Sequence, residues 1–483
     1  MSGNDIVVGI DLGTSSVKVV AVSSHGRVEA HSRRSYPTMR PVPGAAEQNP
    51  ADWIEAVTHS LRDIARQCSP ARWAAIGLSG MLPTMVTLNS RNEPNGNAIT
   101  WEDGRAEWAA AEFRARNGPE LYLRTGARVD GRYLLPMFAR LRKDSPARAH
   151  DTARVVSAKD YLFFVLTGEL LTDPSTAAGY GCYSLPDAAW DENTADLPGV
   201  PDVAPATLWR GLRADFARTI GAPAGLPVVL GAADSVLGAY GLGAHSPGDI
   251  SYIAGTSTVV LGRSARFLPD AAGRYLITPL ERSEFGLEMD LLATGSAIDW
   301  LATLLGEADA GSLVDLAARV PPEDAPTFLP YLAPGEQGAL WMPTLTGSLL
   351  GLTLGSTGAQ IARGLLTGIL LESRRCIGVL AETDPRFSAG RLLVSGSSAS
   401  AGAFRQDLAD ATGLPVCGSA TQMDHSALGA AQLAGEVSNV DVGDSRGSLE
   451  LTAPRADRAA MWSSLFRRHD EFRKSLTEGA PDD

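Results

Sequence analysis

Residues 6–22 read IVVGIDLGTSSVKVVAV, and this stretch decides the fold. Two apolar, largely β-branched runs, 6–10 and 17–22, flank a turn rich in Gly, Ser and Thr, a pattern typical of a β-hairpin. The segment 27–32 can follow as a third antiparallel strand. Later in the chain, 249–261 (DISYIAGTSTVVL) repeats the order strand, Gly-Thr-Ser turn, strand. The repeat predicts two related α/β domains.

Length and composition agree with two soluble domains. The 483 residues exceed the roughly 250 to 300 at which single cores stop growing, so we expect domains 1–246 and 247–483 with the boundary at the Pro247-Gly248 turn. Hydrophobic residues make up 44% and charged ones 20%, as in ordinary globular proteins. A net charge of -13 without a basic stripe argues against nucleic acid as a partner.

The chain shows no sign of a membrane or a disulfide framework. No apolar run reaches about 18 residues, and the first residues lack the pattern of a signal peptide, so we expect a cytoplasmic protein with no membrane partner. Four cysteines have no CxxC spacing and are expected to be buried small hydrophobic residues.

Beyond the hairpins, the sequence predicts strands that end at possible ligand sites. A helix over 50–67 follows from a capping Asn49 and helical apolar spacing, and a short strand from 74–78. Two further strands, 227–230 and 392–394, break at small-residue turns before helices. Ligands in open α/β sheets collect at such strand ends. A last helix is expected around 461–476.

The two hairpin turns suit phosphate binding, because a Gly-Thr-Ser turn offers backbone N–H groups and hydroxyls without bulk. One such turn is explained equally well by turn propensity. Two turns that face each other could hold a triphosphate, with Asp11 orienting a metal through its waters. Lys18 is either a phosphate ligand or a solvated strand residue. The candidate phosphate ligands are Gly13, Thr14, Ser15, Ser16, Lys18, Gly255, Thr256 and Ser257.

Asp234 lies where the strand 227–230 gives way to a helix. Its position is typical of a helix N-cap. The alternative is a catalytic base, since phosphoryl transfer to a hydroxyl needs a carboxylate that accepts the proton, and the small residues 231–233 leave room for a substrate. We favour the base, given the two phosphate turns.

Two other segments have weaker signals. Small residues at 395–398 could lie against an adenine or ribose, or could simply form a tight turn. The segment 101–105 (WEDGR) combines a ring, carboxylates and a guanidinium, which suits a sugar; a salt-bridged loop is the alternative.

Together these segments resemble the FGGY carbohydrate kinases, within the actin-like ATPase superfamily whose domains have ribonuclease H-like cores. The resemblance runs from Ile6 to about Ala434. Its landmarks are 9–18, 47–50 with Trp53, 101–105, 159–161 with 167–169, 231–241, 255–257, 329–332 with 335–336, 347–354, 404–413 and 427–430.

The resemblance implies two ribonuclease H-like domains with a cleft between them and a reaction that uses ATP and Mg²⁺. It implies Asp234 as the base, Asp11 as a residue that positions magnesium, and the segment after Val394 as the adenosine site. It also suggests a homodimer. The residues carried over for adenosine are Gly396, Ser397 and Ser398, and those for substrate are Met81, Trp101, Asp103, Arg105, Asp234 and Ser235.

The chain departs from the xylulokinase pattern at several positions, some of them in the expected substrate site. Residues 80–83 read GMLP where xylulokinases usually show Gln-Met-His, and Ser235 stands where they tend to have asparagine. The adenosine segment begins SGS at 395–397 instead of with three glycines, and Thr367 replaces an acidic residue of the second family signature. These departures put xylulose itself in question.

The sequence therefore predicts an ATP-dependent kinase that phosphorylates a hydroxyl of a small sugar, with a pentulose such as D-xylulose as the first candidate. A kinase for another polyol or for an aldonate such as gluconate is the nearest alternative. A non-catalytic actin-like nucleotide switch or sugar sensor is the rival from another class, and the retained Asp234 argues against it.

Overall fold

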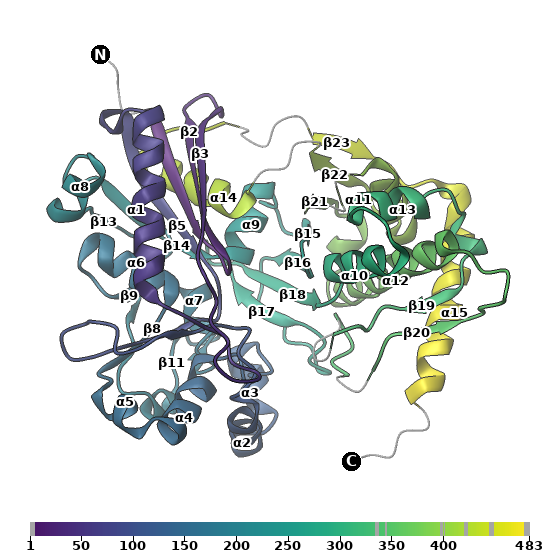
Figure 1. The fold of residues 1–483 in the computed structure, drawn as a ribbon, viewed down its shortest axis with the longest axis horizontal. Helices are drawn as coiled ribbons and strands as arrows, with labels where there is room; N and C mark the ends of the chain where they lie inside the picture. Colours follow the sequence, from purple (N-terminus) through teal and green to yellow (C-terminus); the bar gives the residue numbers. More distant parts are fainter. Residues whose placement is uncertain are drawn as a thin grey trace.

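The structure is a computed structural model, and it describes residues 5–333, 338–342, 345–396, 399, 401–419, 424–443 and 449–477. Two mixed sheets lie side by side, with helices around them (Figure 1). Within the described residues, none of the helices combines the length and the apolar character that crossing a membrane requires.

The first sheet is built around the opening hairpin. The predicted strands pair as expected: β1 (Ile6–Leu12) is antiparallel to β2 (Ser16–Ser23), and β2 to β3 (Val28–Ser35). On the other side β1 pairs in parallel with β5 (Trp73–Gly80), and β5 with β14 (Pro227–Ala233). The sheet has six strands in the order β13 (Trp209–Gly211), β14 (Pro227–Ala233), β5 (Trp73–Gly80), β1 (Ile6–Leu12), β2 (Ser16–Ser23) and β3 (Val28–Ser35).

The second sheet repeats this plan. Its hairpin of β15 (Ile250–Ala254) and β16 (Thr258–Ser264) is antiparallel, and β15 pairs in parallel with β21 (Leu392–Gly396) on its other side. The repeat that the sequence suggested is therefore present in the strand pairing. The seven strands are, in order, β17 (Leu276–Pro279), β18 (Phe285–Leu291), β16 (Thr258–Ser264), β15 (Ile250–Ala254), β21 (Leu392–Gly396), β22 (Val416–Ser419) and β23 (Leu449–Thr452).

Helices cover both sheets. Helix α1 (Pro50–Gln67) begins where the sequence predicted, because the Asn49 side chain accepts a hydrogen bond from the Ala51 amide and Pro50 occupies the first turn. The other helices of the first half are α2 (Glu107–Asn117), α3 (Glu120–Thr125), α4 (Leu134–Asp144), α5 (Pro146–Asp151), α6 (Ala158–Thr167), α7 (Pro174–Ala178), α8 (Ala214–Ile220) and α9 (Asp234–Leu242). Those of the second half are α10 (Gly295–Leu305), α11 (Ala310–Ala317), α12 (Gly358–Thr383), α13 (Gly402–Thr412), α14 (His425–Ser438) and α15 (Ala459–Thr477).

Small two-stranded and four-stranded sheets lie outside the two main ones. In the four-stranded sheet, β7 (Ala98–Ile99) ends just before the segment 101–105, and β8 (Arg154–Ser157) ends just before the segment 159–161. Its strands are β4 (Glu47–Gln48), β7 (Ala98–Ile99), β6 (Met85–Leu88) and β8 (Arg154–Ser157). The short pairs are β9 (Leu171–Thr172) with β12 (Asp202–Val203), β10 (Tyr183–Ser184) with β11 (Ala189–Trp190), and β19 (Thr327–Leu329) with β20 (Ser348–Leu350).

The helices α9 and α14 join the two halves and lie between the two sheets in Figure 1. They approach through glycines: a Cβ on Gly241 would lie 2.1 Å from the His425 carbonyl oxygen, and one on Gly429 would lie 2.0 Å from that of Leu237. Real side chains cannot be that close to backbone, so glycine is required at both positions.

The cysteines only partly follow the prediction. None of the four forms a disulfide, and Cys68, Cys182 and Cys376 are buried. Cys417 is instead half-buried, because β22 lies toward the edge of its sheet with only β23 beyond it.

Candidate active site

The two hairpin turns and Asp234 line one cavity between the two halves. Thr14 comes from the first turn, Ser257 from the second, and Asp234 and Ser235 from the start of α9. The cavity has a volume of about 220 Å³. Segments that are far apart in sequence therefore converge on one cavity.

Asp234 is not a helix cap. The N-cap residue of α9 is Ala233, Asp234 is the first helical residue, and its Oδ1 accepts a hydrogen bond from the neighbouring Ser235 amide at 2.9 Å. Burial raises the pKa of Asp234 to about 7, and the charge of Asp11 adds to the effect. A carboxyl group with a pKa near neutral in a cleft is typical of a general base.

Asp11 and Lys18 form a charged group at the end of the first hairpin. Lys18 Nζ lies 3.3 Å from Asp11 Oδ2 and 2.6 Å from Asp424 Oδ2, and Ser79 Oγ donates to Asp11 Oδ1 at 2.9 Å. Burial raises the pKa of Asp11 to about 6, with Asp424 contributing. Burial alone would lower the pKa of Lys18, but the two carboxylates outweigh it and raise that pKa. Lys18 is thus held between two carboxylates, although its side chain is still 32% exposed.

The remaining residues of the first turn have different environments. The Thr14 hydroxyl accepts a hydrogen bond from Trp101 Nε1 at 2.9 Å, which fixes the indole beside the cavity. Ser15 is exposed, whereas the Ser16 hydroxyl is buried and accepts from Arg33 Nε at 3.2 Å. Gly13 closes the turn by donating its N–H to the Ser16 carbonyl oxygen.

In the second turn, Gly255 and Thr256 are exposed and Ser257 is partly buried at the cavity. Gly255 N–H donates to the Ser257 carbonyl oxygen at 2.8 Å. Of the predicted adenosine residues, Gly396 ends β21 with φ of +108°, while Ser397 and Ser398 lie outside the described residues. Glycine is needed at 396 because a Cβ there would lie 1.8 Å from the Ala254 carbonyl oxygen.

The predicted substrate residues divide into two groups. Trp101, Asp234 and Ser235 line the cavity. Met81 does not, because its side chain is buried in the hydrophobic core of the first half; Leu82 and Pro83 line the cavity in its place.

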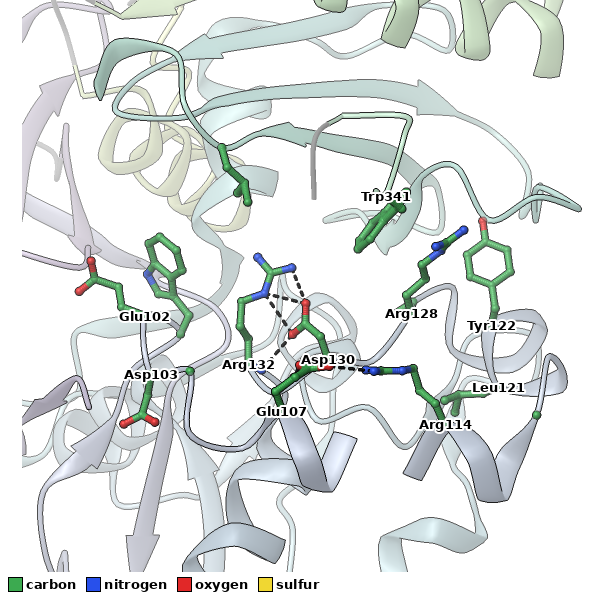
Figure 2. Close-up of a pocket in the computed structure, with 16 residues that line it drawn as sticks. Glu102, Asp103, Glu107, Arg114, Leu121, Tyr122, Arg128, Asp130, Arg132 and Trp341 are labelled. Atoms are coloured by element: carbon green, nitrogen blue, oxygen red, sulfur yellow. Dashed lines mark hydrogen bonds and ion pairs between the residues drawn. The ribbon is translucent and has the colours of Figure 1, made fainter. Parts of the chain in front are cut away.

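Asp103 and Arg105 form the salt-bridged loop that the sequence left open as an alternative. Arg105 pairs with Asp103 at 2.5 Å and with Glu47 at 2.7 Å, and the Ala46 amide donates to Asp103. Asp103 is 1% exposed, and Figure 2 shows its carboxylate turned away from Arg132 and Asp130 across the chamber. Asp103 and Arg105 are therefore bound to each other, and Arg105 is also bound to Glu47 of β4.

A wider chamber of about 960 Å³ adjoins the cavity and shares Trp101, Ala127, Arg132 and Leu292 with it. Figure 2 shows Arg132 and Asp130 turned toward each other in this chamber, with Trp341 facing Arg128. Arg132 pairs with Asp130 at 2.6 Å, and the Arg128 guanidinium lies 5.1 Å from the centre of the Trp341 ring.

Sequence reasoning missed three charged residues of the cavity: Arg132, Glu288 and Asp290. Glu288 and Asp290 are two residues apart on β18, so both side chains lie on the same face of the sheet. This spacing is the feature of the sequence that could have indicated a pair of neighbouring acidic side chains. Burial raises the pKa of Glu288 to about 8, with Asp290 contributing, and burial also raises the pKa of Asp290. Thr278 Oγ1 donates to Glu288 Oε2 at 2.8 Å, and Ser235 Oγ donates to the same oxygen at 3.4 Å.

Within the described residues, no group of three or more His, Cys, Asp or Glu side chains could hold a metal by itself. A magnesium ion that arrives with a nucleotide needs fewer protein ligands, because phosphate oxygens and waters supply the others. The buried carboxylate of Asp11 is a donor of the right chemistry for such an ion.

Comparison with known proteins identifies one family over most of the chain. The model of the FGGY family of carbohydrate kinases, N-terminal domain, matches residues 6–241, and that of the C-terminal domain matches 250–436. The predicted boundary lies between these ranges.

The individual relatives include a gluconokinase and a xylulose kinase. The gluconokinase of Bacillus subtilis (strain 168) is 30% identical over 383 residues, which cover 75% of this chain and 74% of the relative. The xylulose kinase of Escherichia coli (strain K12) is 29% identical over 495 residues, covering 98% and 99%. The crystal structure of gluconate kinase from Lactobacillus acidophilus superimposes with a TM-score of 0.90 at 24% identity, covering 98% of each chain, which shows a shared fold. The chain belongs to the FGGY family of carbohydrate kinases.

Proposed function

We propose that this enzyme transfers the γ-phosphoryl group of ATP, bound with Mg²⁺, to a hydroxyl of an uncharged sugar, first of all a pentulose such as D-xylulose. The observation that carries the proposal is the shared cavity of Thr14, Ser257 and Asp234. In this cavity a substrate hydroxyl can lie beside Asp234, and both hairpin turns can contact the phosphates of ATP.

The proposed roles follow from these positions. Asp234 accepts the proton of the attacking hydroxyl. The turns 13–16 and 255–257 and Lys18 bind phosphate, and Gly396 with Ser397 and Ser398 contacts adenosine. Asp11 positions Mg²⁺, which when bound neutralises charge on the phosphates. In this scheme 1–246 binds sugar and 247–483 binds nucleotide.

The charges of the cavity favour an uncharged substrate over an aldonate. Asp234, Glu288 and Asp290 line it, and the guanidinium of Arg132 is already paired with Asp130. When Asp234 is ionised to act as the base, and above about pH 8 when Glu288 is ionised as well, a substrate carboxylate would face negative charge in a poorly solvated site, where like charges repel strongly. A neutral polyol instead finds hydrogen-bond acceptors there.

Gluconate is the second candidate, and the 30% identity to a gluconokinase favours it. A panel of D-xylulose, other pentuloses, polyols and D-gluconate, assayed by magnesium-dependent ADP release with product mass, separates the two. Turnover on a pentulose at least tenfold above that on gluconate is expected. The reverse preference would retain the kinase mechanism and refute the argument from charge.

The base is tested by Asp234→Asn. We expect ATP binding to persist and kcat to fall by about 10² to 10⁴, because the variant cannot accept the proton. Asp202→Asn changes an exposed carboxylate of the same half and serves as the control with unchanged kcat. Full activity of Asp234→Asn would show that another group is the base.

A further inference from the structure

Strand β14 kinks directly before Asp234. Gly231 has φ of +70°, and the register of β14 against β5 shifts beside it. A Cβ at this position would lie 1.6 Å from the Leu78 carbonyl oxygen, so the close approach requires glycine. The kink interrupts the regular ladder, and the peptide groups of 230–233 need other hydrogen-bond partners.

Two of these partners are side chains of a buried polar cluster. The cluster consists of Lys159, Asp160, Asp173 and Ser175, each at most 1% exposed. Lys159 Nζ donates to the Leu230 carbonyl oxygen at 3.2 Å. The Ala233 amide donates to Ser175 Oγ at 2.9 Å. The turn that leads into Asp234 is therefore held at both ends by the same cluster.

The cluster also fixes the direction of the Ser175 hydroxyl. Ser175 Oγ donates its single proton to Asp173, so its lone pairs are left to accept from the Ala233 amide. Asp173 is in turn held by Lys159, whose Nζ lies 3.0 Å from Asp173 Oδ1. This ion pair lets a carboxylate stay buried beside the hydroxyl that it orients.

We propose that Ser175, oriented by Asp173, is a positioning residue that holds the Ala233 amide and thereby sets the place of Asp234 in the cleft. The inference rests on the proposed role of Asp234 as the base. Proton transfer demands a base within hydrogen-bond reach of the attacking hydroxyl, and a displacement of about 1 Å lowers rates by about a hundredfold. Loss of the hydroxyl at 175 releases the amide of Ala233, the residue that directly precedes the base.

The test compares Ser175→Ala with Ser157→Ala, using the panel sugar that gives the fastest turnover. Ser157 is a matched control, because its hydroxyl is equally buried and has no hydrogen-bond partner among the described residues. For Ser175→Ala we expect kcat to fall 10- to 100-fold with KM for the sugar within threefold of wild type. The acid limb of the kcat/KM profile should move to lower pH as Asp234 gains access to water. Ser175→Thr, which keeps a hydroxyl, should recover most of kcat.

The outcomes separate the possible roles of Ser175, which also lines the cavity. A rise of tenfold or more in KM with kcat unchanged would mean that Ser175 contacts the sugar and would overturn the positioning role. An unchanged kcat and acid limb would overturn it as well. If Asp234→Asn is inactive in either case, the proposed function stands and only this inference fails; if Asp234→Asn is fully active, both fall.

Discussion

Replacing Asp234 by Asn should stabilise the folded protein at alkaline pH. The folded pKa of Asp234, about 7, is raised above the ordinary value of 3.8. The folded state therefore holds this proton more tightly than the unfolded chain. Its contribution to stability is fully present below about pH 4 and is lost as pH rises through 7. At pH 8 the wild type must keep a buried carboxylate that Asn does not have.

The size of the effect follows from the shift. About 3 pKa units correspond to about 4 kcal/mol, which is an upper limit because the Asp234 side chain is partly exposed in the cleft. Half of that, about 2 kcal/mol, raises the Tm of a unit of about 200 residues by roughly 4 to 8 °C. At pH 5 the folded carboxyl is protonated but the unfolded one is already ionised, so roughly a third of the gain at pH 8 is expected.

Thermal unfolding of wild type and Asp234→Asn at pH 8 and pH 5, without ligands, measures this difference. Asp202→Asn, at an exposed site of the same half, should show no pH-dependent gain. A lower Tm for Asp234→Asn at pH 8, or an equal gain at both pH values, would refute the assignment of a raised pKa to this side chain.

Other perturbations have equally definite outcomes. In the wild type, kcat/KM should fall about tenfold per pH unit below pH 7, as Asp234 gains its proton, and a flat profile down to pH 5 would contradict its role. Glu288→Gln should improve kcat/KM for D-gluconate relative to D-xylulose by roughly tenfold, measured by ADP release at about pH 9, because above the Glu288 pKa of about 8 one negative charge leaves the cavity. Gly231→Ala should yield little folded protein on expression, since the added Cβ would meet the Leu78 carbonyl. Glu372→Gln should lower stability by about 3 to 5 kcal/mol in urea unfolding, because the buried Glu372 carboxylate accepts from Tyr331, Arg375 and His469.

The sequence predicted those elements that depend on residues close together in the chain. The hairpin 6–22 is recognisable because its apolar runs and its turn are contiguous, and helix α1 because Asn49 and Pro50 mark its start. Both depend on contacts between near neighbours in the chain.

The charge pattern of the cleft could not be predicted in the same way. Glu288 and Asp290 belong to the other half of the chain, and only the meeting of the two halves at the cavity makes them neighbours of Asp234. Met81 was misplaced for a related reason: a strand end in sequence does not show which of two successive side chains points into the core. The structure buries Met81 and leaves Leu82 at the cavity.

The close packing of α9 and α14 indicates which parts of the site move together. Asp234 begins α9, and α9 meets α14 through glycines that leave no space for sliding. Asp424, which caps α14, pairs with Lys18 at 2.6 Å. Asp234, the two helices and the Lys18–Asp424 pair therefore form one frame, whereas the turn 255–257 is carried by a hairpin of the second sheet. If the cleft closes over the sugar, that turn should approach the frame while the Lys18 to Asp424 pair stays intact.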